Sequence, residues 1–155
     1  MSNVLTGVRQ AVKARLETVT VDNGYLTNLG FNVLSGWLNE VLEADKVPDQ
    51  FALIQRAPGK ALERGPAAVK NPVGFFLMGL TRTSFENYED LLDEMELDLI
   101  RAFMPTPGVL PKGFPKGVTG FQLGAPEHFP PGKGQQHAGV LIPIHITTII
   151  EDKSR

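Results

Sequence analysis

The sequence has no cysteine, no long hydrophobic run and no strong net charge, and each absence excludes a class of function. Without cysteine there are no disulfides, no thiolate nucleophiles and no sulfur-ligated metal sites. No stretch approaches the roughly 18 consecutive apolar residues of a membrane-spanning helix. Arg9, Lys13 and Arg15 interrupt the N-terminal segment, where a signal peptide needs a continuous apolar core. A formal net charge of -2 argues against nucleic acid or anionic lipid as the main partner.

The chain does contain enough apolar residues for one folded domain. It has 155 residues, of which 42% are hydrophobic and 21% charged. A chain of this length buries roughly two-thirds of the surface that its unfolded form exposes, so a core forms without cross-links. Because no internal repeat and no change in composition marks a boundary, we interpret residues 1–155 as a single domain and take the cytosol as its default compartment.

Two segments show the period of amphipathic helices. The first covers residues 3–17, and the second covers residues 85–103, with Ser84 as the expected N-cap and Met104-Pro105 as the stop. We interpret the acidic side of the second helix as a solvated face, because catalytic carboxylates need burial or a charged neighbour to separate their pKa values. Its seven acids are Glu86, Glu89, Asp90, Asp93, Glu94, Glu96 and Asp98.

Five segments have the composition or the alternation of strands. Pro143 lies in the last of them and cannot donate to a ladder, which predicts an edge position or a bulge there. Together with the helices, these segments predict an α+β fold: a mainly antiparallel sheet of about four to five strands with two helices packed on one face. The predicted strands are residues 26–34, 51–56, 73–81, 118–123 and 138–150.

Two connections are expected to be flexible loops. The first, residues 56–72, contains three prolines. The second, residues 105–137, is a long insertion rich in proline and glycine before the last strand, interrupted only by the short strand at 118–123. Loops of this length inside a compact domain are more often functional or mobile than structural.

Few residues form a pattern that points to catalysis, and no catalytic, cofactor-binding or metal site is predicted. Lys133 is flanked by glycines, but a phosphate-binding P-loop needs Ser or Thr directly after the lysine, and Gly134 stands there. Glu127, His128 and His137 have the chemistry of metal ligands without the spacing of a helical pair. A small metal- or phosphate-dependent enzyme that uses these residues therefore stays open as an alternative.

Charge is distributed unevenly along the chain, which suggests contacts between copies. Residues 56–72 carry four cations against the single acid Glu63, a local net charge of +3, while the second helix is acidic. Opposite patches on one subunit favour a head-to-tail contact, which closes into a ring when the rotation permits. The candidate interface residues are Arg56, Lys60, Arg64 and Lys70 on the basic side and Glu89, Asp93 and Glu96 on the acidic side.

The stretch NGYLTNLGFNVLSG, residues 23–36, follows the first helix and precedes the strands FALIQR and VGFFLMGLTR. With the helix YEDLLDEMELDLIRAF and the last strand AGVLIPIHITTI, this order resembles the tail terminator family of long-tailed bacteriophages. The resemblance covers nearly the whole chain by element order, although the 105–137 segment is longer than expected for the family. Its most specific residues are Asn23, Gly24, Tyr25, Thr27 and Gly30.

The resemblance implies a structural protein of the virion without a small-molecule reaction or cofactor. Subunits of that family form a hexameric ring on the head-proximal end of the tail tube, which ends tube polymerisation and offers a surface to the head. The implied partners are other copies of the chain, the tail tube protein and a connector protein of the neck. Assembly would take place in the cytoplasm of the host bacterium. A head-closure or connector protein of the neck is the alternative within the same class.

Overall fold

The computed structural model describes residues 3–44, 47–104 and 113–151, which form an α+β fold. The helices in these ranges are α1 (Val4–Leu16), α2 (Leu38–Glu43) and α3 (Tyr88–Ala102). None of the described helices is long and apolar enough to cross a membrane. The same ranges contain the strands β1 (Val33–Ser35), β2 (Gln50–Ala57), β3 (Glu63–Gly65), β4 (Ala68–Arg82), β5 (Val118–Leu123), β6 (Glu127–Phe129) and β7 (His137–Glu151).

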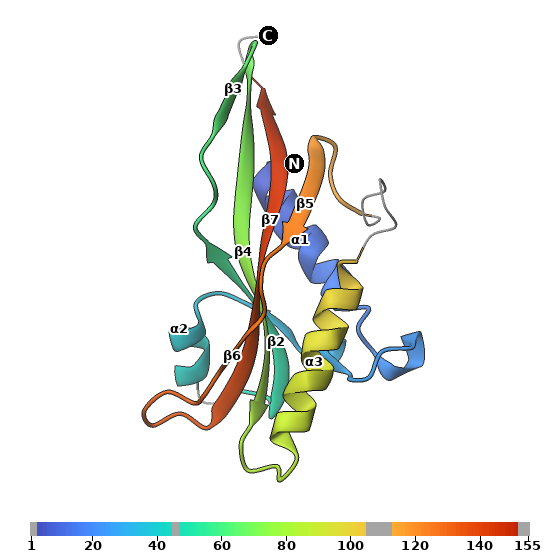
Figure 1. The fold of residues 1–155 in the computed structure, drawn as a ribbon, viewed down its shortest axis with the longest axis vertical. Coiled ribbons are helices and arrows are strands. Elements are labelled where there is room, and N and C mark those ends of the chain that lie inside the picture. Colours follow the sequence, from blue (N-terminus) through green and yellow to red (C-terminus); the bar gives the residue numbers. More distant parts are fainter. Residues whose placement is uncertain (1–2, 45–46, 105–112, 152–155) are drawn as a thin grey trace.

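Two long strands, β4 and β7, form the centre of a seven-stranded sheet. Each has 15 residues, and they pair antiparallel along their whole length. β4 is flanked by β2 on one half and by β3 on the other, while β7 is flanked by β6 and β5 in the same way. β1 joins β2 in parallel, so the sheet is mixed. Figure 1 shows β3 and β5 towards one end of the molecule and β2 and β6 towards the other.

Each long strand contains a proline at the break between its two flanking strands. The carbonyl of Pro72 in β4 accepts a hydrogen bond from the Lys60 N–H, between the ends of β2 and β3. The carbonyl of Pro143 in β7 accepts one from the Gly124 N–H, between β5 and β6. Because the N and the carbonyl of a strand residue point to the same side, each missing donor faces a break in the neighbouring ladder. The expected edge strand or bulge at Pro143 is therefore wrong, since β7 is central.

The main core lies between the sheet and the two longer helices, on the same side of the long strands (Figure 1). Asn3 caps α1, its side chain accepting from the Thr6 N–H at 2.8 Å. The alternation predicted for the last strand is confirmed, because its inward residues are buried and their neighbours are less so. The buried side chains include Val8, Val12 and Leu16 of α1, Leu92, Met95 and Leu99 of α3, and Ile142, Ile144 and Ile146 of β7.

A second apolar cluster covers the opposite face of the sheet around β2. Ala52 and Ile54 face the main core, whereas Phe51 and Leu53 belong to the second cluster, so β2 is buried on both faces. Leu38 and the rest of α2 pack against this second cluster. The prediction of two helices on one face thus describes α1 and α3 and omits α2, and the sheet has more strands than the four to five expected.

The strand predicted at 26–34 is wrong for most of its length. Residues 21–23 and 29–31 form single 3-10 turns, η1 (Val21–Asn23) and η2 (Leu29–Phe31), and only 33–35 pair with the sheet as β1. Leu29 is buried, whereas Phe31 is 68% exposed. The apparent alternation of apolar residues therefore does not correspond to one buried face.

Two other expectations about irregular structure are also wrong. Residues 56–72 are not one loop, because 63–65 and 68–72 form the β3–β4 hairpin. In the segment 105–137 the short strand predicted at 118–123 is confirmed as β5, whereas the strand β6 was not expected, and 105–112 lie outside the described residues. Finally, Ser84 is not the N-cap of α3: the helix begins after Asn87, and neither of these side chains makes a cap bond.

Candidate interaction surfaces

The connection between α1 and the sheet is attached to a buried carboxylate on α3. Asp98 has no exposed surface and accepts three hydrogen bonds. The Leu26 N–H donates to Oδ1 at 3.0 Å, and the Thr27 N–H and hydroxyl donate to Oδ2 at 2.8 and 2.7 Å. Hydrogen bonds to a charged acceptor are stronger than neutral ones, so this contact fixes the connection to a helix 71 residues further along the chain.

The other residues of the NGYLTNLG pattern shape the same connection. The Asn23 side chain donates to the Thr18 carbonyl at 2.8 Å, and the Thr20 side chain caps η1. Gly24 follows with φ +91, a left-handed conformation that glycine adopts without strain. Tyr25 is partly buried against the main core. The structure thus brings these residues together as the scaffold of this connection.

Gly30 is the position where this connection approaches the end of α1 most closely. Its N–H donates to the Val19 carbonyl at 2.7 Å, and a Cβ at residue 30 would lie 2.5 Å from the Glu17 carbonyl oxygen. That separation is shorter than real Cβ contacts, so the close approach explains why glycine stands here.

Two of the four candidate basic residues lie on a projecting arm, which we define as residues 63–70 of the β3–β4 hairpin with residues 149–151 of β7 beside them. Arg64 and Lys70 are exposed there. Lys70 faces Glu63 and Arg64 faces Val69 across the hairpin, and neither cation makes an ion pair with a described residue. Arg64 differs from Lys70 in having no acidic residue opposite it in the hairpin, so it is the cation of the arm that we consider for a contact with a partner.

The other two candidate cations are bound along the side of the sheet. The Arg56 guanidinium carbon lies 5.5 Å from the centre of the Phe75 ring, a cation–π distance. The Lys60 ammonium donates to the Gln122 side chain at 2.9 Å. The basic set predicted from the sequence is therefore divided between the arm, which carries Arg64 and Lys70, and the side of the sheet, where Arg56 and Lys60 have contacts of their own.

The three candidate acidic residues border a groove between α3 and the segment that follows β6, which we call the α3 groove. Its volume is about 390 Å³. Glu89 and Asp93 line it and are exposed, whereas Glu96 lies beyond them and its carboxylate is 2.7 Å from His128 Nε2. Besides Glu89, Asp93 and His128, the lining consists of Tyr88, Leu92, Phe129, Pro130, Pro131 and Ala138.

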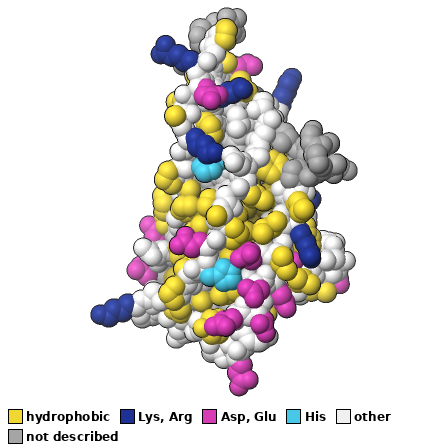
Figure 2. Space-filling view, viewed as in Figure 1, with side chains coloured by type: hydrophobic (Ala, Val, Ile, Leu, Met, Phe, Trp, Pro, Cys, Tyr) yellow, Lys and Arg dark blue, Asp and Glu magenta, His cyan; other side chains and the backbone are white. Residues whose placement is uncertain are grey.

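The arm and the α3 groove lie at opposite ends of the molecule. Figure 2 shows acidic side chains gathered over α3 at one end of the long axis, and lysine and arginine side chains around the arm at the other. Figure 1 shows the same separation, with β3 and the N-terminal end of α3 far apart along that axis. A contact between the two surfaces therefore has to join different copies of the chain.

A second groove, of about 370 Å³, opens on the sheet face that carries α2. Trp37 lines it with 55% of its surface exposed, next to Phe76 and Phe129. An exposed tryptophan beside an apolar groove is typical of a protein contact surface. No local pattern in the sequence indicates this surface, because its residues come from β2, β4, β6 and β7 as well as α2.

The residues considered for an enzyme lie in different surroundings. His128 pairs with Glu96, Glu127 lines the Trp37 groove, and Lys133 is exposed in the connection from β6 to β7. Among the described residues, no group of three or more His, Asp or Glu side chains is placed to hold a metal ion.

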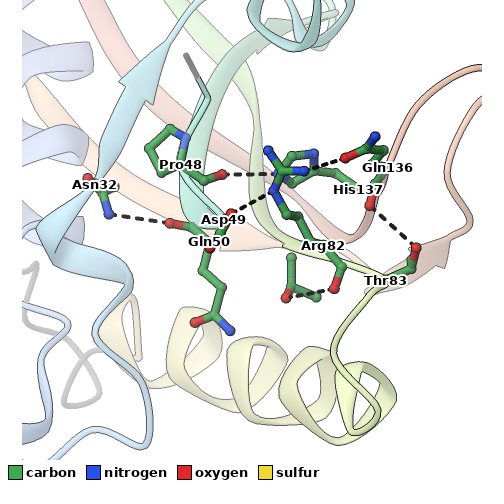
Figure 3. Close-up of polar contacts among 9 residues, drawn as sticks. Asn32, Pro48, Asp49, Gln50, Arg82, Thr83, Gln136 and His137 are labelled. Carbon is green, nitrogen blue, oxygen red and sulfur yellow. Dashed lines mark hydrogen bonds and ion pairs between the residues drawn. The ribbon is translucent and has the colours of Figure 1, made fainter. Parts of the chain in front are cut away.

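His137 belongs to a polar cluster at the ends of β2, β4 and β7 (Figure 3). Its Nε2 lies 3.0 Å from the Pro48 carbonyl, and its ring packs edge-on against Phe51. Beside it, Arg82 Nε lies 2.6 Å from the Asp49 carboxylate. Burial lowers the pKa of His137, and Arg82 lowers it further, against the opposing effects of the Pro48 carbonyl and Asp49. The contacts of this cluster hold the ends of β2, β4 and β7 together, and they account for the burial of His137.

Asp98 is the important residue that the periodicity assigned wrongly. It was counted with the acids of the solvated face, and it is buried. Its position two turns after the apolar Leu91, close to Met95 and Leu99 on the buried stripe, was the available signal.

Comparisons with models of known protein families and with curated protein sequences find no match to this chain.

Proposed function

We propose that this chain is the tail terminator subunit of a long-tailed bacteriophage. In this role, copies of the chain form a ring on the head-proximal end of the tail tube. The ring ends tube polymerisation and provides the surface to which the head or neck attaches. The partners are then other copies of the chain, the tail tube protein and a connector protein of the neck, and the protein resides in the virion.

The observation that carries this proposal is the placement of an arm with exposed Arg64 and Lys70 and of a groove lined by Glu89 and Asp93 at opposite ends of one elongated domain. A contact between unlike surfaces is heterologous, and repetition of a heterologous contact gives either a closed ring or an open filament. The resemblance of NGYLTNLG and of the element order to the tail terminator family favours the ring. A structural role is also consistent with the scaffold function of Asn23, Gly24 and Thr27.

The proposal is tested by imaging and weighing the purified chain. Native mass spectrometry and negative-stain microscopy are expected to find closed rings of about six subunits. Rings added to growing tail tubes of the same phage are expected to stop elongation at one end. Monomers at high concentration without affinity for tubes would contradict the proposal. Rings that bind the portal side of the neck and leave tube growth unchanged would favour a head-closure protein instead.

A further inference from the structure

We propose that the α3 groove is the receptor for the arm of the next copy, with Arg64 inserted between Glu89 and Asp93. This inference rests on the proposed ring and names the contact that builds it. The groove and the arm each have a chemistry that fits the other, and among the described residues neither Arg64 nor Glu89 nor Asp93 makes an ion pair.

The groove fits an arginine side chain. Glu89 and Asp93 are four residues apart on α3, so their carboxylates lie on the same side of the helix. The planar guanidinium presents several donors to carboxylates, and its aliphatic stem packs well on aromatic surface such as Tyr88 and Phe129. Within the described part of the chain, no lysine or arginine lines the groove.

The arm fits the groove in shape and in polarity. It projects beyond the rest of the sheet as a narrow hairpin (Figure 1), and Arg64 is exposed on it. Leu62, directly before β3, is 64% exposed and supplies an apolar side chain next to that charge. Pro130 and Pro131 in the groove provide apolar surface for it. Charge selects the site, and the burial of apolar surface adds to the binding.

Charge reversal tests this contact. We expect Arg64→Glu alone and the double variant Glu89→Lys, Asp93→Lys alone to raise the concentration for half-maximal assembly by at least about tenfold at low salt. The matched controls are Arg9→Glu on α1 and the double variant Asp90→Lys, Glu94→Lys on α3, which make the same charge changes outside the groove lining. The controls are expected to assemble like the wild type.

Mixing the two variants gives the sharper result. The arm of the first variant, with an acid at position 64, matches the lysine-lined groove of the second, and Arg64 on the arm of the second matches the acidic groove of the first. An equimolar mixture is therefore expected to recover assemblies in which the two variants alternate, visible by mass as equal numbers of each. Assembly of either variant alone at the wild-type concentration, or no recovery in a mixture of variants that are folded by circular dichroism, would overturn the inference.

Cross-linking separates this contact from the proposed function. Because the chain has no cysteine, Leu62→Cys with Pro130→Cys introduces the only two thiols. A short bismaleimide is expected to give a ladder of cross-linked copies with the double variant, and no such ladder with either single variant. Closed rings without the ladder would refute the arm contact and leave the terminator role intact. A ladder of open chains without rings would support the contact and count against the terminator role.

Discussion

The buried carboxylate of Asp98 gives a quantitative prediction for Asp98→Asn. An asparagine keeps one oxygen, which can stay at the Oδ2 position and accept from the Thr27 N–H and hydroxyl. Its amide nitrogen then faces the Leu26 N–H, donor against donor. The substitution therefore loses one hydrogen bond and turns two charge-assisted bonds into neutral ones.

The expected loss follows from the difference between these bonds. Hydrogen bonds to charged groups contribute about 1.5–3 kcal/mol each, and neutral ones about 1 kcal/mol. The free energy gained by no longer burying a charge offsets part of the loss. We expect a net destabilisation of about 2 kcal/mol for Asp98→Asn. Asp98→Ala leaves all three donors without an acceptor and is expected to cost about 3–5 kcal/mol.

Urea unfolding at a concentration where the chain is monomeric measures both values. Asp90→Asn is the matched control, since it removes a carboxylate from an exposed site on the same helix, and it is expected to cost about 0.5 kcal/mol. Amide hydrogen exchange adds a local measurement: the N–H groups of residues 26 and 27 should exchange faster in Asp98→Asn than the global destabilisation explains. A change no larger than that of Asp90→Asn would refute the structural role of Asp98.

Three further outcomes are expected. Gly30→Ala should cost about 1–3 kcal/mol in urea unfolding because of the clash with the Glu17 carbonyl, whereas Gly120→Ala, with open space around it, should cost less; equal costs would contradict the close approach. Because the pKa of His137 is lowered in the folded state, the unfolded chain takes up the proton first as the pH falls below about 6.5, and stability declines. His137→Gln should remove that part of the decline, and an unchanged slope would refute the assignment. Assembly should weaken as salt rises, and insensitivity to salt would argue against charge as the driving force.

Local periodicity was sufficient to predict the helices and strands that pack against other helices and strands. The helix at 3–17, the strand at 118–123 and the alternation of 138–150 were predicted from the sequence, because each presents one apolar face to a core. The 26–34 segment failed because its backbone bonds to Asp98, a partner 71 and 72 residues away that no local pattern contains. Asp98 was misassigned because it was grouped with the other acids of the helix, although its spacing from Met95 and Leu99 places it on the buried stripe.

The sequence predicted which charged residues the candidate surfaces contain, but it did not predict where these residues lie in the fold. A count of charges indicated a basic segment and an acidic helix, but the division of Arg56 and Lys60 from Arg64 depends on Phe75 and Gln122, which lie elsewhere in the chain. The prolines of residues 56–72 predicted a loop because proline interrupts ladders, whereas Pro72 lies where a ladder is already interrupted. Proline alone does not distinguish these two situations.

The two prolines in the long strands also protect the sheet against a folding error that its hydrophobic pattern does not prevent. A slip of one residue between neighbouring strands turns every side chain to the wrong face, but a slip of two residues keeps all faces correct. A double slip of β4 past β2 in one of the two directions would place Pro72 opposite Ala57, and the corresponding slip of β7 past β5 would place Pro143 opposite Gln122, in positions where a donor is needed. The alignment of the strands is thus encoded partly in the two backbone nitrogens that carry no hydrogen.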